Sequence, residues 1–160
     1  MKTNLMKLML TLGLLIASLG VQAQEKQFEK YSDVKGVQYV FISKAMLKLA
    51  GNMAAPKVPG VNMKGIVDKL TAMQIISSEE KEQTAKLKAD ALYITQNDKY
   101  ELLMQIDDDG DKIRIFIKEG KSQSHLLMLM EEDGEIGVFI LSGTFKKKDL
   151  EALSNMADNK

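Results

Sequence analysis

Four aspartates surround one glycine in the segment QIDDDGDKIRI, Gln105 to Ile115, and carboxylates at this density can bind calcium. An EF-hand loop takes oxygen ligands at positions 1, 3 and 5, glycine at position 6 and glutamate at position 12. Counted from Asp107, the first three carboxylates are present, but Lys112 stands at the glycine position and Lys118 at the glutamate position. The segment that follows alternates like a strand, so the EF-hand interpretation fails and only a weak surface calcium site stays as an alternative.

A two-residue hairpin turn explains the same segment better. Asp-Gly is favoured in such turns because both residues tolerate a positive φ. With Asp109-Gly110 at the tip, two ion pairs and four apolar pairs fall into register, and a shift of one residue would turn the apolar face to solvent. The predicted pairs are Asp108/Asp111, Asp107/Lys112, Ile106/Ile113, Gln105/Arg114, Met104/Ile115, Leu103/Phe116, Leu102/Ile117 and Glu101/Lys118.

The segment LLMLMEEDGEIGVFIL predicts a second hairpin, with Asp133-Gly134 at its tip. Both faces of this hairpin are apolar, which leaves two explanations. Its strands are central and covered on both sides, or one apolar face is exposed and marks a partner or dimer interface. The predicted pairs are Leu129/Val138, Met128/Phe139, Leu127/Ile140 and Leu126/Leu141.

Most catalytic and cofactor chemistry lacks the residues it needs. His125 is the single histidine, and the chain has no cysteine or tryptophan. A Ser-His-Asp set would have to use His125 near the start of a strand, without a GxSxG elbow. Zinc needs three or four nitrogen or sulfur ligands, and no phosphate-binding glycine motif is present. We therefore predict no catalytic, cofactor-binding or metal-binding residue, and no cofactor.

Adjacent charged residues offer weaker candidates. Paired carboxylates can hydrolyse glycosides, and Glu79-Glu80 and Glu131-Glu132 are adjacent acids. The first pair fits the first turn of a helix, where acids suit the helix dipole, and the second flanks a turn. Lys146 to Lys148 begin a predicted helix and fit either a solvated corner or a contact with an anionic group.

Eight methionines follow the N-terminal segment, and methionine serves both as a core filler and on adaptable binding surfaces. Most fall on predicted apolar faces, which favours core filling. Met53 and Met63 are the expected exceptions, because they flank the loop of Asn52 to Asn62 that holds both prolines. The eight are Met46, Met53, Met63, Met73, Met104, Met128, Met130 and Met156.

The elements that position these residues follow from periodicity and capping signals. We expect one α+β domain with a mixed or mostly antiparallel sheet of about six strands, including a C-terminal four-stranded meander, and with helices packed mainly on one face. Ser43 is a good N-cap for a helix that Gly51 can end, and Ser77 with Glu80 has capping-box spacing. The expected strands are 36–43, 72–77 and the meander of 100–142, and the expected helices begin at 44, 62, 78 and 146. The longest helix is the one from 78, and it ends at Asn97-Asp98. Its apolar stripe is Thr84, Leu87, Ala91 and Ile94.

The N-terminal residues 1–23 have the three-part pattern of a secretory signal peptide: Lys2 and Lys7, an apolar run, and small residues before cleavage near Ala23. We expect a linker over 24–35 and a single domain over 36–160. Residues 1–23 hold two of the 22 basic residues and none of the 22 acidic ones, so the remainder carries a net charge of −2. That balance argues against nucleic acid as a partner. The mature form contains no second long apolar run, so we expect no membrane span in it.

The stretch FEKYSDVKGVQYVFISKAMLKLAG, Phe28 to Gly51, resembles a family of exported Bacteroidota proteins known as domain of unknown function 4252. The resemblance implies export from a Gram-negative cell, to the periplasm or the outer membrane. The family has no assigned activity, so no catalytic residue is carried over. Without a cysteine, this chain has no residue for the lipid anchor of some exported relatives.

The expected function is that of an exported, non-enzymatic binding or interaction module of the cell envelope, periplasmic or secreted. Its partner would be an envelope protein, a small ligand or a second copy in a homodimer. One alternative is a small carboxylate-based hydrolase or carbohydrate-active enzyme. The other is a carrier of a small apolar ligand or lipid, with the methionine- and proline-containing loop as its lid.

Overall fold

A computed structural model describes residues 26–54, 65 and 67–154, and the helices and strands discussed below lie within these ranges. The chain divides into two compact units, residues 1–30 and 31–160, and the sheet lies entirely in the second. A short 3-10 turn, η1 (Glu29–Tyr31), precedes the sheet.

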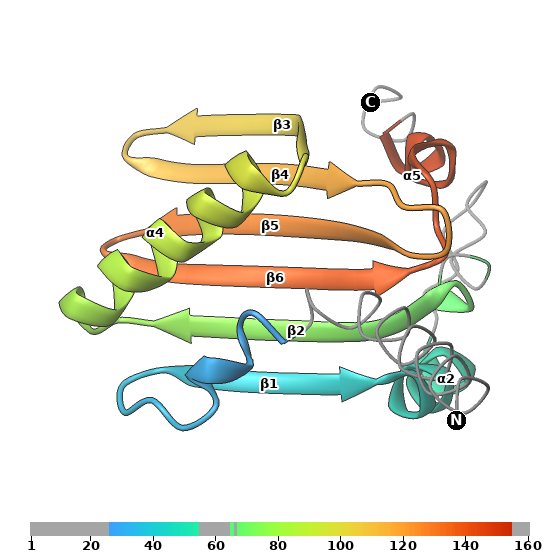
Figure 1. The fold of residues 1–160 in the computed structure, drawn as a ribbon, viewed down its shortest axis with the longest axis horizontal. Helices are drawn as coiled ribbons and strands as arrows, with labels where there is room; N and C mark the ends of the chain where they lie inside the picture. The colour runs from blue at the N-terminus through green and yellow to red at the C-terminus, as the bar shows by residue number, and fades with distance from the viewer. Residues whose placement is uncertain (1–25, 55–64, 66, 155–160) are drawn as a thin grey trace, which may run out of the picture. The chain divides into compact units, whose positions relative to one another are not determined.

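Six strands form one antiparallel sheet in the order β1-β2-β6-β5-β4-β3 (Figure 1). Neighbouring strands of the C-terminal half follow one another in sequence, so β3 to β6 make the predicted meander, and the predicted α+β class is confirmed. The strands are β1 (Gln38–Ser43), β2 (Leu70–Ser78), β3 (Glu101–Asp108), β4 (Asp111–Lys118), β5 (Ser124–Glu132) and β6 (Glu135–Gly143).

Both predicted Asp-Gly turns are confirmed. Asp109 and Gly110 have φ values of 46° and 105°, and Asp133 and Gly134 have values of 48° and 87°. Positive φ at both central residues is the geometry that suits the twist of a two-residue hairpin. In the second hairpin, all four predicted apolar pairs are present, from Leu129/Val138 to Leu126/Leu141.

The predicted register of the first hairpin is confirmed near the turn and is wrong at the far end of the strands. Pairs from Asp108/Asp111 to Met104/Ile115 are as predicted, but a β-bulge at Leu103 then shifts the strand. Leu102 pairs with Phe116 and Glu101 with Ile117, one residue away from the predicted partners. A bulge inserts one unpaired residue, which a count outward from the turn cannot include.

The longest helix, α4 (Lys81–Asn97), lies across one face of the sheet (Figure 1). Its stripe Leu87, Ala91 and Ile94 is buried as predicted, whereas Thr84 is partly exposed. The predicted capping box is wrong, because Ser77 and Ser78 belong to β2 and the helix begins only at Lys81. Ser78 Oγ instead accepts a hydrogen bond from Glu80 N at 3.1 Å and donates one to Gly36 O at 2.6 Å.

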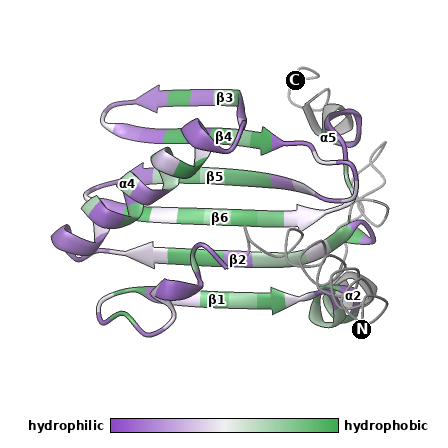
Figure 2. Cartoon of the chain, in the orientation of Figure 1, coloured by the Kyte–Doolittle hydropathy of each residue, from purple (hydrophilic) through white to green (hydrophobic). Residues whose placement is uncertain are grey.

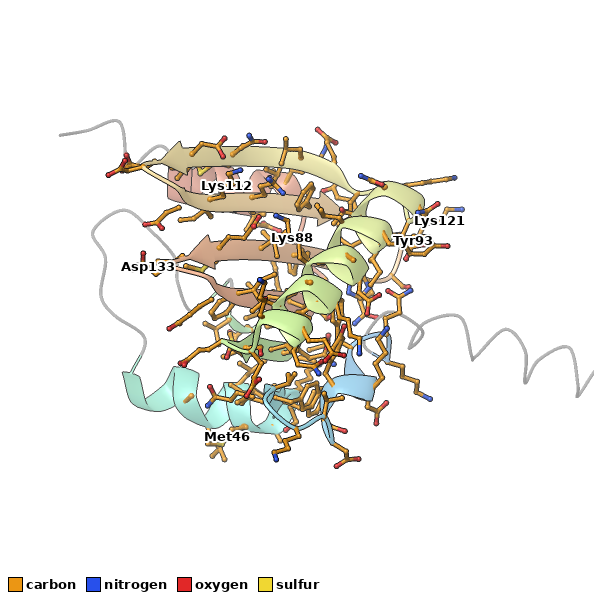
Figure 3. All side chains as sticks on the ribbon, turned by 90° about the vertical axis from the view of Figure 1, so that its left-hand side faces the viewer. Met46, Lys88, Tyr93, Lys112, Lys121 and Asp133 are labelled. Carbon is orange, nitrogen blue, oxygen red and sulfur yellow. The ribbon has the colours of Figure 1, made fainter. Side chains whose placement is uncertain are left out.

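The helices α2 (Lys44–Ala54) and α5 (Lys147–Ser154) pack at one end of the sheet, against the face opposite α4 (Figure 3). Ser43 caps α2 as predicted, with Met46 N donating to Ser43 Oγ at 3.4 Å. Gly51 does not end α2, which continues to Ala54 because a single glycine weakens a helix without forbidding it. The buried cluster at this end comprises Leu47, Leu70, Ile117, Leu126 and Phe145.

Several predictions fall largely outside the described residues. They are the signal peptide of 1–23, most of the loop of 52–62 and most of the helix expected from 62. Within that expected helix, Gly65 and Val67 are helical, but Leu70 already belongs to β2. Within the described part, no helix combines the length and apolar character required to cross a membrane.

Candidate interaction face

The two faces of the β5–β6 hairpin have different surroundings. Leu127, Leu129 and Val138 point toward α4 and are almost completely buried. Their sequence neighbours Met128 and Phe139 point to the opposite face and are only partly buried. Side chains alternate along a strand, so adjacent residues point to opposite faces of the sheet. One of these faces is the buried core, and the described helices cover the other only in part.

We call this second surface the open face, and it consists of three rows that run across all six strands. The register defines each row, since every member pairs with its neighbour on the next strand. The tip row, nearest the Asp-Gly turns, is Gln38, Ser77, Gly137, Met130, Ile113 and Ile106; the middle row is Val40, Ile75, Phe139, Met128, Ile115 and Met104; the helix row is Ile42, Met73, Leu141, Leu126, Ile117 and Glu101.

The described helices cover the open face unevenly. In the helix row, Ile117 and Leu126 are buried as members of the cluster that also contains Leu47 of α2 and packs against Leu150 of α5. The other two rows become more exposed toward the β3 edge, where Met104 is 48% and Ile106 is 44% exposed. Neither of these two rows contains a charged residue. Figure 2 shows that apolar residues of the two faces together predominate along the middle of β1, β2, β5 and β6. A continuous, uncharged patch of this kind is typical of an interaction site.

The methionines gather on this face, so the prediction that they fill the core holds in part: Met73 packs against the buried cluster, whereas Met104 is about half exposed. Of the five whose side chains are described, none is fully buried, and four belong to the open face. The exception, Met46, is 57% exposed on α2 and points away from the sheet (Figure 3). Methionine is flexible and polarisable, so a surface rich in it adapts to a partner's shape. The four on the open face are Met73, Met104, Met128 and Met130.

The open face lies between two ends of opposite charge. Both Asp-Gly turns are at the tip end, where residues 107–112 and 131–135 hold eight acids and one lysine. The other end, which we call the helix end, carries α2, the β4–β5 connection and the segment leading into α5. Its residues 44–48, 117–122 and 144–149 hold seven lysines and two acids. The near-zero net charge of the sequence conceals this separation.

The acidic turn and the lysine run have structural roles. Among the described residues, no group of three or more histidine or acidic side chains is arranged to hold a metal ion. Lys146 donates from its side chain to Gly120 O, and Lys147 forms an ion pair with Glu101. Lys146 N also donates to Asp149 Oδ2 at 2.8 Å, which caps α5. The bulge therefore gives Glu101 a different partner from the predicted Lys118.

His125 is a buried structural residue. It is 5% exposed, and its Nδ1 lies 3.0 Å from Ser142 Oγ on the paired strand. Burial, with a smaller effect from Lys118, lowers the pKa of His125 to about 4. A neutral imidazole and a hydroxyl that are both inaccessible cannot meet a substrate without local opening. The pair instead connects β5 to β6 on the face of the sheet opposite the open face.

The candidate carboxylates do not assemble into a facing pair. Glu79 and Glu80 are exposed before α4, whereas Glu131 is a counter-ion for two cations. Its Oε2 lies 2.6 Å from Lys88 Nζ, and its Oε1 lies 3.7 Å from Arg114 Nη1. A hollow of about 350 Å³ near the start of α4 contains Glu131 and Glu132 among its lining residues, but it also contains Lys81 and Lys88. A smaller hollow of about 140 Å³ lies beside Gly137, between Met130 and Phe139.

Sequence reasoning identified the two-sided apolar hairpin but not the open face as a whole. The contributions of β1, β2 and β4 were missed, because each strand taken alone reads as buried. The signal that could have found the face is the alternation itself, extended across the register of every strand. Even that alternation would not have shown which of the two faces α4 covers.

Together, the fold and this site define an antiparallel α+β domain with a long helix across one face and an opposite apolar face that the described helices cover only in part. The chain belongs to the family described as Domain of unknown function (DUF4252), whose model matches residues 31–153. The predicted family is therefore confirmed. No curated protein matches the sequence.

Two solved structures show a distant likeness. One is the crystal structure of a protein of unknown function from Pseudomonas aeruginosa, at 12% identity and a TM-score of 0.34, covering 81% of this chain and 85% of that one. The other is the solution structure of a cyanobacterial PsbP from Synechocystis sp. PCC 6803, at 17% identity and a TM-score of 0.35, covering 80% and 85%. At these TM-scores the likeness carries no functional argument.

Proposed function

We propose that this protein is an exported, non-enzymatic interaction module whose binding surface is the open face of the sheet. One observation carries the proposal: the middle row crosses all six strands without a charged or polar side chain, and Met104 at its end is about half exposed. Leaving such a surface in water forgoes about 25 cal/mol for each Å² that a partner could cover.

The chemistry of the face supports binding over catalysis. Catalysis needs polar or ionisable groups that converge on a reacting atom, and the middle row offers only hydrocarbon and thioether groups. His125 and Ser142 are buried on the other side of the sheet, and Glu131 is engaged by Lys88 and Arg114. Export remains part of the proposal, and it is supported by the N-terminal pattern of residues 1–23.

Affinity purification from the native cell envelope tests the proposal, with three tagged chains compared by mass spectrometry of proteins and lipids. The chains are the wild type, Phe139→Glu on the open face, and Tyr93→Glu on α4 as a matched control. Tyr93 is also aromatic, but it is 67% exposed on the helix. We expect bound species shared by the wild type and Tyr93→Glu, an untagged copy of the chain included, and their loss with Phe139→Glu. Identical recoveries from all three would overturn the proposal.

A further inference from the structure

We propose that the partner of the open face is a second copy of this chain, docked face to face with its strands antiparallel to those of the first. This rests on the proposed function, because it assigns an occupant to the same face. A two-fold axis along the middle row would bring each residue of that row opposite its own copy, as an isologous interface requires. Since that row is uncharged, closing the interface buries no unpaired charge there.

Charge decides the direction of docking. With antiparallel strands, the acidic tip end of each copy lies over the lysine-rich helix end of the other. With parallel strands, acidic ends would meet each other and lysine-rich ends would meet each other. Like charges brought together cost several kcal/mol and suppress the wrong arrangement. The charges without an ion pair in the described part of the chain include Asp108, Asp109, Asp111, Glu132, Asp133 and Glu135 at the tip end, and Lys44, Lys48, Lys121 and Lys148 at the helix end.

The shape of the open face favours the same direction. The helices α2 and α5 both lie at the helix end, on the side of the sheet away from α4 (Figures 1 and 3). They form a step over the helix row, at the end of the open face that is farthest from the tip row. Antiparallel docking sets the step of each copy next to the tip end of the other, whereas parallel docking would oppose the two steps and hold the sheets apart.

Pairing through the edge strand β3 is one competing way to join two copies. Every residue of β3 is exposed, and an exposed edge can accept another strand. However, the strand contains Glu101, Asp107 and Asp108 and no cation, so self-pairing would bring six carboxylates together. Face-to-face docking avoids this repulsion.

The oligomeric state of the purified full chain is the first test. Size-exclusion chromatography with light scattering should give twice the mass of one chain at low salt. Phe139→Glu should raise the dimer dissociation constant by about a hundredfold or more, since it introduces a charge at the centre of the interface. Tyr93→Glu should leave the constant unchanged, and circular dichroism checks that each variant is folded. A wild type that stays monomeric into the hundreds of micromolar would overturn the dimer. It would leave the proposed function intact if Phe139→Glu still lost partners in the envelope purification.

Site-specific cross-linking tests the position of the axis without a disruptive substitution. The chain contains no cysteine, so one introduced thiol is unique. Packed sheets lie about 10 Å apart, and a bismaleimide of that reach should therefore join two copies of Met128→Cys. Tyr93→Cys should form the same dimer but gain no covalent cross-link, and it should therefore run as a single chain on a denaturing gel. Cross-linking of both variants to the same extent, or of Tyr93→Cys alone, would overturn the arrangement.

Charge reversal tests the direction. Asp108→Lys with Glu132→Lys at the tip end should weaken the dimer about tenfold at low salt, and Lys121→Glu with Lys148→Glu at the helix end should do the same. The four substitutions together should restore most of the affinity, because acidic and basic ends exchange places. Additive weakening in the fourfold variant would overturn the antiparallel direction.

Discussion

Met128 and Phe139 lie directly opposite each other on β5 and β6, at the middle of the sheet and on the face that α4 does not cover. Their chain neighbours Leu129 and Val138 form the corresponding pair on the α4 face. The two pairs are adjacent in sequence and similar in polarity, yet only the second is sealed into the core. This relationship gives a direct test of which face stabilises the monomer.

Truncation on the α4 face should cost more than truncation on the open face. Leu129→Ala removes a side chain that is buried beneath α4 and should lower the free energy of unfolding by about 3 kcal/mol. Met128→Ala removes one that is partly exposed and should lower it by about 1 kcal/mol. Urea unfolding at high dilution, where association does not contribute, measures both. Equal losses would show that the open face is sealed within the monomer.

His125 should make the protein less stable as the medium is acidified. The folded chain keeps His125 neutral down to about pH 4, whereas the unfolded chain takes up a proton near pH 6.5. The unfolded state therefore binds more protons between these values, and stability falls by roughly 2–3 kcal/mol as the pH is lowered through this window. Urea unfolding across the window should show a shallower fall for His125→Gln, which can keep a hydrogen bond to Ser142. The same pH dependence in both proteins would contradict the assignment.

The stability of the first hairpin turn should depend on Gly110 because of its backbone conformation, and not because a larger side chain would lack space. Gly110 has a φ of 105°, and a Cβ added there would meet no atom within 4 Å. Gly110→Ala should therefore cost about 1 kcal/mol through the disfavoured backbone conformation. Asp109→Asn is the matched control and should be nearly neutral, since both residues tolerate a positive φ. Thermal melting compares them, and an unchanged midpoint for Gly110→Ala would refute this account.

Calcium should not stabilise the protein. The four aspartates around the first turn include a facing pair, Asp108 and Asp111, but the register aligns Asp107 with Lys112 and no cage closes around a cation. A thermal melt should be unmoved by millimolar calcium. A rise in the midpoint that Asp108→Asn abolishes would establish a site at the turn.

The N-terminal segment should be removed on export. Cleavage after Ala23 predicts a mature chain that begins at Gln24. Mass spectrometry of the protein recovered from the periplasm or the medium measures its N-terminus. Replacing Ala23 with a bulky residue should leave the precursor uncleaved, and a full-length chain in the exported fraction of the wild type would count against a cleaved signal.

The sequence by itself determined the local geometry. Asp109-Gly110 and Asp133-Gly134 fixed two turns, and the alternation beyond them fixed the register of both hairpins as far as Leu103. These features depend on residues close to one another in the chain, where φ preferences and side-chain alternation act directly. The bulge at Leu103 lies beyond that reach, because it is decided by how β3 fits its neighbours.

Only the tertiary structure decided which apolar face is covered. Met128 and Leu129 carry similar hydrophobic signals, and nothing in either side chain says which of them α4 will meet. That choice depends on the path from β2 through α4 to β3, which places Leu87, Ala91 and Ile94 over one side of the sheet. The same path leaves the opposite apolar rows open between an acidic end and a lysine-rich end, and the binding surface proposed for this protein exists only once those distant segments are brought together.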